Sequence, residues 1–255
     1  MLHNVVEIAK IAGNIAREGF RGNFQIDLKS NVLDLVTEYD KKCESAIIKY
    51  VNKNFPNHSI LAEESGEAKK SSDYTWVIDP IDGTTNFAHG LPLFSVSIGV
   101  LKGNETVCGA VYDVMRDAMY AAELGSGSYC NERKIHVSEN DDLSRSVLVT
   151  GFPYDIKDNP DAAIEKFAAF LKSCRAVRRL GSAAIDFCYV AEGVFDGFWE
   201  VSLNPWDICG GKLIVEEAGG IVTNFKGNSI DTFSKQILAT NRLVHLDMIE
   251  ILNKA

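Results

Sequence analysis

The sequence has few positive charges for its size, and this shortage limits the partners that it can have. Its 255 residues include 26 lysines and arginines against 35 aspartates and glutamates, so the formal net charge is −9. A chain of this charge repels the phosphate backbone of DNA or RNA instead of displacing its counterions. We therefore expect nucleic acid not to be the primary ligand.

Long apolar runs and paired cysteines are also missing. The longest apolar run, residues 91–101, is interrupted by serines and is shorter than the roughly 20 residues that span a bilayer. Residues 2–20 carry charges among their apolar side chains, unlike the core of a signal peptide. The 6 cysteines are scattered without a Cys-x-x-Cys pair, as in a reducing compartment. We expect a cytoplasmic protein with no membrane span.

Apolar spacing and turn residues predict the order of the elements. Two amphipathic helices are predicted around residues 5–15 and 43–51, the second after a capping pattern of Thr37 and Asp40. Short strand patterns then predict a largely antiparallel sheet, at residues 59–62, 75–78, 94–101, 106–112 and 118–122. From residue 146 strands alternate with helices, with strands at 147–150, 176–179 and 197–201 and helices at 160–171, 183–191 and 206–218.

This order predicts an α/β (α+β) fold. With 46% hydrophobic residues the chain can bury a full core, and no repeat or long linker divides it. We expect one unit over residues 1–255, with sub-halves of roughly 1–145 (α+β) and 146–255 (α/β). Residues 65–73 are predicted to form an extended polar loop.

The most informative segment covers residues 76–87, where an apolar strand ends in Asp79 and Asp82 and turns through Gly83 into Thr84. Pro80 stiffens the turn, so the two carboxylates can lie on the same side despite their separation of three residues. Carboxylates so close together repel unless a divalent cation lies between them. Hard oxygen ligands favour Mg²⁺ or Mn²⁺ over zinc. A helix beginning near Thr84 would offer free N–H groups to a phosphate.

Each acidic residue also has a purely structural interpretation. Asp79 and Asp82 can build a turn, and Asp207, which precedes a helical pattern, can be a helix N-cap. Asp40 can serve only the capping pattern, and Glu63 can be a solvated surface residue. The ordered run over residues 76–87 favours the metal-binding interpretation.

The chain resembles the inositol monophosphatase family through several motifs at matching spacing. These are Asp79-Pro80-Ile81-Asp82-Gly83-Thr84-Thr85-Asn86-Phe87, Glu63-Glu64-Ser65, Gly181-Ser182-Ala183-Ala184, Pro205-Trp206-Asp207 and Glu217-Ala218-Gly219-Gly220, with Leu35-Val36-Thr37 and Asp40 upstream. The resemblance covers nearly the whole length. It implies a layered αβαβα sandwich of the inositol monophosphatase / fructose-1,6-bisphosphatase type and a Mg²⁺-dependent phosphatase activity.

The resemblance also implies a role for each matching residue. Two or three Mg²⁺ ions, with Mn²⁺ as an alternative, would be held by Glu63, Asp79, the main-chain carbonyl of Ile81, Asp82 and Asp207. The catalytic set would be Glu63 with Thr84, which would hydrogen-bond Asp40 and orient the attacking water. Substrate would be bound by Asp82, Gly83, Thr84, Thr85, Ala183, Glu200 and Asp207, with Glu200 contacting hydroxyls of the alcohol. Lys29 would lie near the metals.

The substrate implied first is myo-inositol monophosphate. Other enzymes with this core act on fructose 1,6-bisphosphate, histidinol phosphate, phosphoadenosine phosphate or NADP, and residues 151–154 have no confident match in the family. The resemblance further implies a homodimer and inhibition by Li⁺. A haloacid-dehalogenase phosphatase is disfavoured because Pro80 stands where its nucleophilic aspartate belongs. A non-enzymatic alternative is a binding partner of the transcription machinery.

Overall fold

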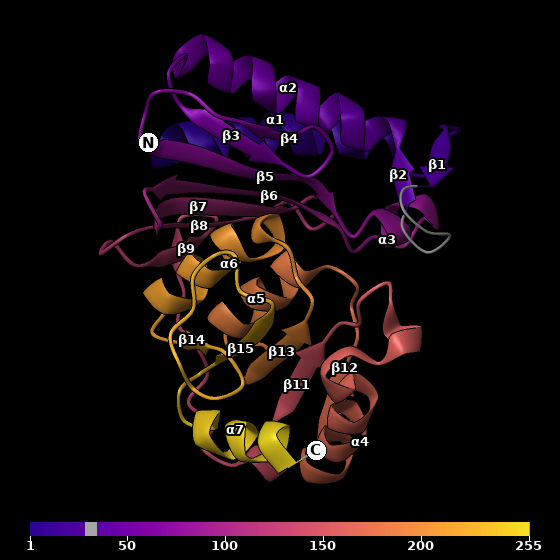
Figure 1. Cartoon of the computed structure of the whole chain (residues 1–255), viewed down its shortest axis with the longest axis vertical. Coiled ribbons are helices and arrows are strands. Elements are labelled where there is room, and N and C mark those ends of the chain that lie inside the picture. The colour runs from indigo at the N-terminus through magenta and orange to yellow at the C-terminus, as the bar shows by residue number, and fades with distance from the viewer. Residues whose placement is uncertain (29–34, 255) are drawn as a thin grey trace.

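A computed structural model describes residues 1–28 and 35–254 (Figure 1). The helices of this part of the chain are α1 (Leu2–Gly19), α2 (Glu38–Asn54), α3 (Thr84–Ala88), α4 (Ala163–Ser173), α5 (Ala183–Ala191), α6 (Pro205–Glu217) and α7 (His245–Lys254). Short 3₁₀ turns occur at η1 (Leu143–Arg145), η2 (Ile156–Asp158) and η3 (Pro160–Ala162).

The strands form two main sheets. The first, in the order β10-β9-β8-β7-β6-β5-β3-β4, contains β3 (Ser59–Ala62), β4 (Gly66–Ala68), β5 (Tyr74–Asp82), β6 (Ser95–Lys102), β7 (Glu105–Asp113), β8 (Ala118–Glu123), β9 (Ser128–Cys130) and β10 (Arg133–Lys134). The second, in the order β12-β11-β13-β15-β14, contains β11 (Val147–Thr150), β12 (Ala176–Arg178), β13 (Gly197–Val201), β14 (Ile221–Thr223) and β15 (Gln236–Thr240). A small hairpin pairs β1 (Ile26–Leu28) with β2 (Leu35–Thr37).

The molecule has five layers. Helices α1 and α2 cover one face of the first sheet, α5 and α6 lie between the two sheets, and α4 and α7 cover the far face of the second sheet (Figure 1). This confirms the predicted layered αβαβα sandwich. Helices α5 and α6 pack between the two sheets, as is expected for a single unit. The single unit over residues 1–255 and its division near residue 145 stay predictions.

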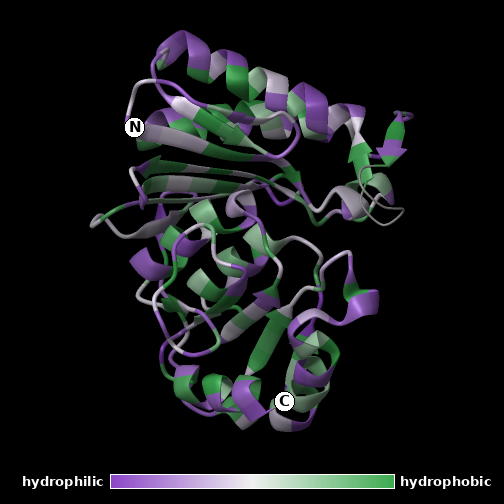
Figure 2. Ribbon diagram, in the orientation of Figure 1, coloured by the Kyte–Doolittle hydropathy of each residue, from purple (hydrophilic) through white to green (hydrophobic). Residues whose placement is uncertain are grey.

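The burial of the helices follows from their sequences. In α1 the apolar residues at helical spacing are buried, among them Val5, Ile8 and Ala12, while α2 alternates hydrophilic and hydrophobic segments (Figure 2). Helix α5 is different, because all nine of its residues are buried. A helix buried all round needs apolar residues on every side, and the acidic side chain of Asp186 within α5 breaks this rule.

Two details differ from expectation. The predicted polar loop at residues 65–73 contains β4, which pairs antiparallel with β3; a three-residue edge strand with exposed side chains has too little periodicity to be recognised. The first sheet is antiparallel from β5 to β10, as predicted, but β3 and β5 are parallel. Among the described helices, none is long and apolar enough to cross a membrane.

Candidate active site

A β-bulge in β5 brings Asp79 and Asp82 to the same face of the sheet. Residues three apart in a regular strand point to opposite faces. Here Asp79 pairs with Ser97 and Asp82 with Ser95, so three steps on β5 match two steps on β6. The extra residue restores a common direction. The sequence interpretation placed both carboxylates correctly on one side. Their common direction, however, is produced by a bulge within the strand and not by a turn after it.

The corner after β5 depends on Gly83. Its φ of 95° is in the left-handed region, and a Cβ built there would lie 3.1 Å from the carbonyl oxygens of Leu93 and Gly181. Asn86, one turn further on, is buried and donates to the carbonyls of Leu93 (2.7 Å) and Leu180 (2.8 Å). The predicted helix start at Thr84 is confirmed, and the loop before α5 is tied to this corner.

Thr84 and Asp40 make the predicted contact. The Thr84 Oγ1 lies 3.1 Å from Asp40 Oδ1 and 3.0 Å from the Ile81 carbonyl oxygen, so its proton can go to either acceptor. Asp40 also accepts bonds at Oδ2 from the backbone N–H (2.8 Å) and hydroxyl (2.5 Å) of Thr37, which completes the predicted capping box of α2. Structural capping and contact with Thr84 therefore coexist. Lys29 lies outside the described residues.

Asp207 is carried by the first turn of α6. It is not the N-cap of this helix, as one interpretation of the sequence held. Asn204 is the N-cap, Pro205 is the first helical residue, and Asp207 is the third, whose Oδ2 accepts a 2.7 Å bond from the Asn204 N–H. This capping box fixes the Asp207 side chain.

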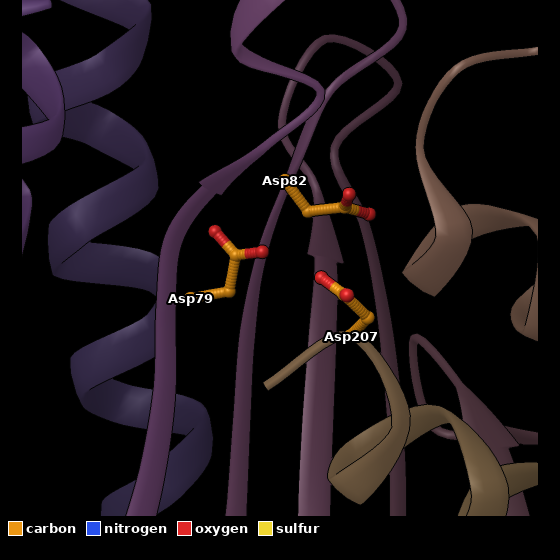
Figure 3. A group of neighbouring side chains, drawn as sticks. All are labelled: Asp79, Asp82 and Asp207. Carbon is orange, nitrogen blue, oxygen red and sulfur yellow. The ribbon is translucent and has the colours of Figure 1, made fainter. Parts of the chain in front are cut away.

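Three carboxylates converge from these elements. Oxygen atoms of Asp79, Asp82 and Asp207 lie within 4.8 Å of one another, and Figure 3 shows the three side chains grouped together. Burial, and then the charges of Glu63, Asp82 and Asp207, raise the pKa of Asp79 well above its usual value. Burial and the charge of Asp82 do the same to the pKa of Asp207.

The donor set of this cluster fits a hard divalent cation. The cluster is all oxygen, and no His or Cys lines the cavity beside it among the described residues. The mutual repulsion that raises the pKa values is relieved when a cation neutralises the carboxylates. Oxygen ligands of this type suit Mg²⁺ or Mn²⁺ and not zinc.

Asp82 is oriented by residues that the sequence interpretation did not assign. Its Oδ2 accepts bonds from the Ser182 hydroxyl (2.5 Å), the Ala184 N–H (2.8 Å) and, more weakly, the Ser95 hydroxyl (3.4 Å). Burial raises the pKa of Asp82, and these donors oppose the rise. Ser182 lies in the matched motif before α5 and follows Gly181, so the motif was the available signal.

A cavity of about 400 Å³ adjoins the cluster. It is lined by every predicted site residue except Asp40, namely Glu63, Asp79, Ile81, Asp82, Gly83, Thr84, Thr85, Ala183, Glu200 and Asp207. Asp40 is fully buried behind Thr84 and does not line the cavity. The volume is in the range of small-molecule sites.

Glu200 lies on β13, in the part of the cavity formed by the second half of the chain. Burial, followed by the charges of Asp207 and Asp82, raises its pKa well above the usual value. Gly151 lies directly against it: a Cβ at Gly151 would be 2.1 Å from Glu200 Oε1. Residues 151–154, which had no confident match in sequence, thus form part of the cavity wall together with Asp155.

Two further charged residues line the cavity and were missed. Asp186 of α5 is 1% exposed. Arg179 is exposed and precedes the Gly181 corner. The signal for Asp186 was a single acid within an apolar helical pattern three residues after Ala183. The sequence analysis predicted a helix at residues 183–191 and assigned no role to Asp186.

A layered fold that gathers three carboxylates beside a ligand-sized cavity is the arrangement expected of a metal-dependent hydrolase. Residues 1–255 match the inositol monophosphatase family. Phosphatase IMPL1, chloroplastic, of Arabidopsis thaliana is 43% identical over 98% of this chain and 69% of its own length. Nus factor SuhB of Pasteurella multocida is 43% identical over 100% of this chain and 95% of its own.

A solved structure agrees with these sequence relatives. The inositol monophosphatase of Anabaena superposes with a TM-score of 0.90 at 38% identity, covering 100% of this chain and 95% of that one. The chain therefore belongs to the inositol monophosphatase family and is a phosphatase of that family.

Proposed function

We propose that the protein hydrolyses a small phosphate monoester in a Mg²⁺-dependent reaction, and that its substrate is myo-inositol monophosphate, which gives inositol and phosphate. The observation that carries the proposal is the convergence of Asp79, Asp82 and Asp207 within 4.8 Å beside a cavity that also contains a buried carboxyl, Glu200. The first feature suits metal and phosphate, and the second suits an alcohol rich in hydroxyl groups.

The cations would be divided between two sets of ligands. Glu63, Asp79 and the Ile81 carbonyl would hold one ion, and Asp79, Asp82 and Asp207 a second. When bound, divalent cations supply positive charge that neutralises the phosphate and acidifies water. Glu63 lines the same cavity as Asp79, and its charge contributes to the raised pKa of Asp79, as is expected of two neighbouring ligands.

The protein's own residues would position the water and the phosphate. When the Thr84 hydroxyl donates a hydrogen bond to Asp40, its lone pairs are free to accept a hydrogen bond from the attacking water and so to orient that water. Gly83, Thr84 and Thr85, at the corner between β5 and α3, would cradle the phosphate with main-chain N–H groups and a hydroxyl. Glu200, with Ala183 beside it on the cavity wall, would accept hydrogen bonds from the alcohol.

The test is phosphate release from a panel of esters. Inositol, fructose, histidinol and adenosine phosphates and NADP are each assayed with Mg²⁺, with Mn²⁺, with a chelator and with added Li⁺. Release that requires the divalent ion and has its highest kcat/KM on inositol monophosphate supports the whole proposal. A higher kcat/KM on another ester replaces the substrate but keeps the metal-dependent chemistry. Equal release in the presence of chelator contradicts the metal site.

A second candidate function is suggested by the relatives named Nus factor SuhB. We propose that this chain also binds a component of the transcription machinery through a surface separate from the cavity. Purified RNA polymerase should then co-elute with both the wild type and Asp82→Asn, because this variant changes only the cavity. Failure of both proteins to co-elute counts against the second function and leaves the hydrolase untouched.

Two expectations from the sequence remain proposals. A homodimer is proposed, and sedimentation velocity would report the mass of the particle. A cytoplasmic location is proposed from the cysteine pattern; in the structure the 6 cysteines are unpaired, five of them buried and Cys174 partly exposed. Fractionation of cells that produce the protein checks the location.

A further inference from the structure

Asp186 is a buried acid that has no role in the proposed hydrolysis. It lies on α5 three residues after Ala183, so both face the same side of the helix, and both line the cavity. Its side chain is 1% exposed. Within residues 1–28 and 35–254, its Oδ1 has no hydrogen-bond partner.

A buried carboxyl without a partner is costly, and another buried acid of this fold, Asp113, avoids the cost. A buried polar group loses its bonds to water and must be compensated by other bonds. Asp113, on β7, is equally buried but accepts a bond from the Tyr189 hydroxyl (3.2 Å) and lies 3.9 Å from the Arg116 guanidinium. Among the described residues, Asp186 Oδ1 has no such hydrogen bond and Asp186 forms no ion pair, although the more distant charge of Arg179 acts on it and both residues line the cavity. A ligand in the cavity is the missing partner that this position allows.

A second carboxyl of the same cavity points to the kind of ligand. Glu200 is also buried, and its charge acts directly on Asp186. Among the described residues, neither of the two forms an ion pair. Two buried carboxyls that line one cavity and repel each other suit a ligand that offers them hydrogen bonds without bringing further negative charge. Neighbouring hydroxyl groups of a polyhydric alcohol have this property.

We propose that Asp186 is a second specificity-determining residue, which together with Glu200 accepts hydrogen bonds from two hydroxyl groups of the leaving alcohol. This inference rests on the proposed hydrolase function. The class of substrate is a phosphate monoester of a polyhydric alcohol. In an ester of phenol or of a simple alkyl alcohol, the only oxygen of the leaving group is the ester oxygen. Such a group would cover Asp186 without offering it a hydrogen-bond donor, and a site built to bond hydroxyls discriminates strongly against such analogues.

The experiment compares two esters in four proteins. Myo-inositol 1-phosphate and phenyl phosphate are assayed with saturating Mg²⁺ in the wild type, Asp186→Asn, Asp186→Ala and Asp113→Asn. Asp186→Ala should lower kcat/KM on the inositol ester by about 10- to 100-fold, mainly through KM, and this loss should exceed the loss on phenyl phosphate by about tenfold or more. Asp186→Asn, which keeps the size and one acceptor oxygen, should show a smaller loss of the same selectivity.

The control separates recognition from folding. Asp113→Asn removes a buried carboxyl that does not line the cavity, so it should lower the melting temperature while leaving the ratio of the two kcat/KM values unchanged. If the two Asp186 variants keep the wild-type ratio of the two kcat/KM values, whether both values fall equally or neither changes, the proposal is overturned and Asp186 is a structural residue.

The same assay distinguishes this failure from failure of the proposed function. If the wild type hydrolyses phenyl phosphate with Mg²⁺ but discriminates against the inositol ester, the metal-dependent hydrolase stands and the role of Asp186 is refuted. If neither ester releases phosphate, the proposed function fails and the inference fails with it.

Calorimetric titration of free myo-inositol gives an independent readout: binding should be weaker to Asp186→Ala than to the wild type, and equal affinity contradicts the proposal.

Discussion

Replacing Gly151 by alanine would place a methyl group in the space that the Glu200 carboxylate occupies. The new Cβ would lie 2.1 Å from Oε1 and 2.4 Å from Oε2 of Glu200. The φ of Gly151 is outside the left-handed region, so alanine can adopt the backbone, and the clash must be relieved by movement of Glu200. Ordinary contact begins at 3.4 Å, so the carboxylate must retreat by about 1 Å or more.

The expected cost follows from that displacement. A misplacement of about 1 Å in a group that orients a substrate can lower the rate about 100-fold. This corresponds to about 2.7 kcal/mol of transition-state stabilisation. The loss should be seen as kcat/KM on myo-inositol 1-phosphate, measured with saturating Mg²⁺. Far-ultraviolet circular dichroism and the melting temperature would show that the fold is kept.

A double-mutant cycle decides whether Glu200 transmits the effect. Glu200→Ala vacates the space that the methyl group introduced by Gly151→Ala would need, so combining the two substitutions should cost almost nothing beyond Glu200→Ala alone. The coupling free energy should then be nearly as large as the effect of Gly151→Ala alone. Additive effects of the two substitutions, or wild-type kcat/KM in Gly151→Ala, would refute the steric reasoning.

Three other predictions concern the metal ligands and a buried histidine. Ser182→Ala removes the 2.5 Å bond to Asp82 and should weaken Mg²⁺ activation roughly 10- to 100-fold in a Mg²⁺ titration; Ser95→Ala, at 3.4 Å, should have a smaller effect. Asp82→Asn should lower kcat by roughly 1000-fold with an unchanged circular dichroism spectrum, and near-wild-type turnover would contradict the metal site. Burial lowers the pKa of His245 from 6.5 to about 4, so the neutral form is favoured in the folded state. As the pH falls from 6.5 to 4, the unfolded state takes up the proton first, and the wild type should lose about 3 kcal/mol of unfolding free energy relative to His245→Gln in urea titrations.

Residues whose role depends on local sequence could be predicted. The spacing of Asp79, Asp82, Gly83 and Thr84 indicated a corner rich in oxygen ligands. This was possible because the strand pattern, the proline and the glycine each constrain the backbone of residues only a few positions away. The capping pair Thr37 and Asp40 was readable for the same reason. The alternation of strands and helices from residue 146 indicated an α/β half, and the layered sandwich was implied by the family resemblance.

What could not be predicted depends on contacts between distant segments. Nothing near Asp82 in sequence indicates that Ser182, 100 residues later, donates to its carboxylate. The space beside Gly151 is filled by Glu200 only because β11 and β13 are neighbours in the second sheet. Asp186 carried a local signal, but its position at the cavity wall follows from the packing of α5 between two sheets, which periodicity alone does not reveal.

The middle layer has an electrostatic consequence. Both of its helices begin at the cavity: Ser182, the N-cap of α5, and Asn204, the N-cap of α6, are among its lining residues. The aligned peptide dipoles of a helix place a partial positive charge at its N-terminus. Two such ends face a cavity in a chain whose net charge is −9. Seven carboxyl side chains line the same cavity, namely Glu63, Asp79, Asp82, Asp155, Asp186, Glu200 and Asp207. The two helix ends therefore add to the positive charge of bound cations in attracting an anion, and salt screens these main-chain dipoles less inside the fold than it screens surface charges.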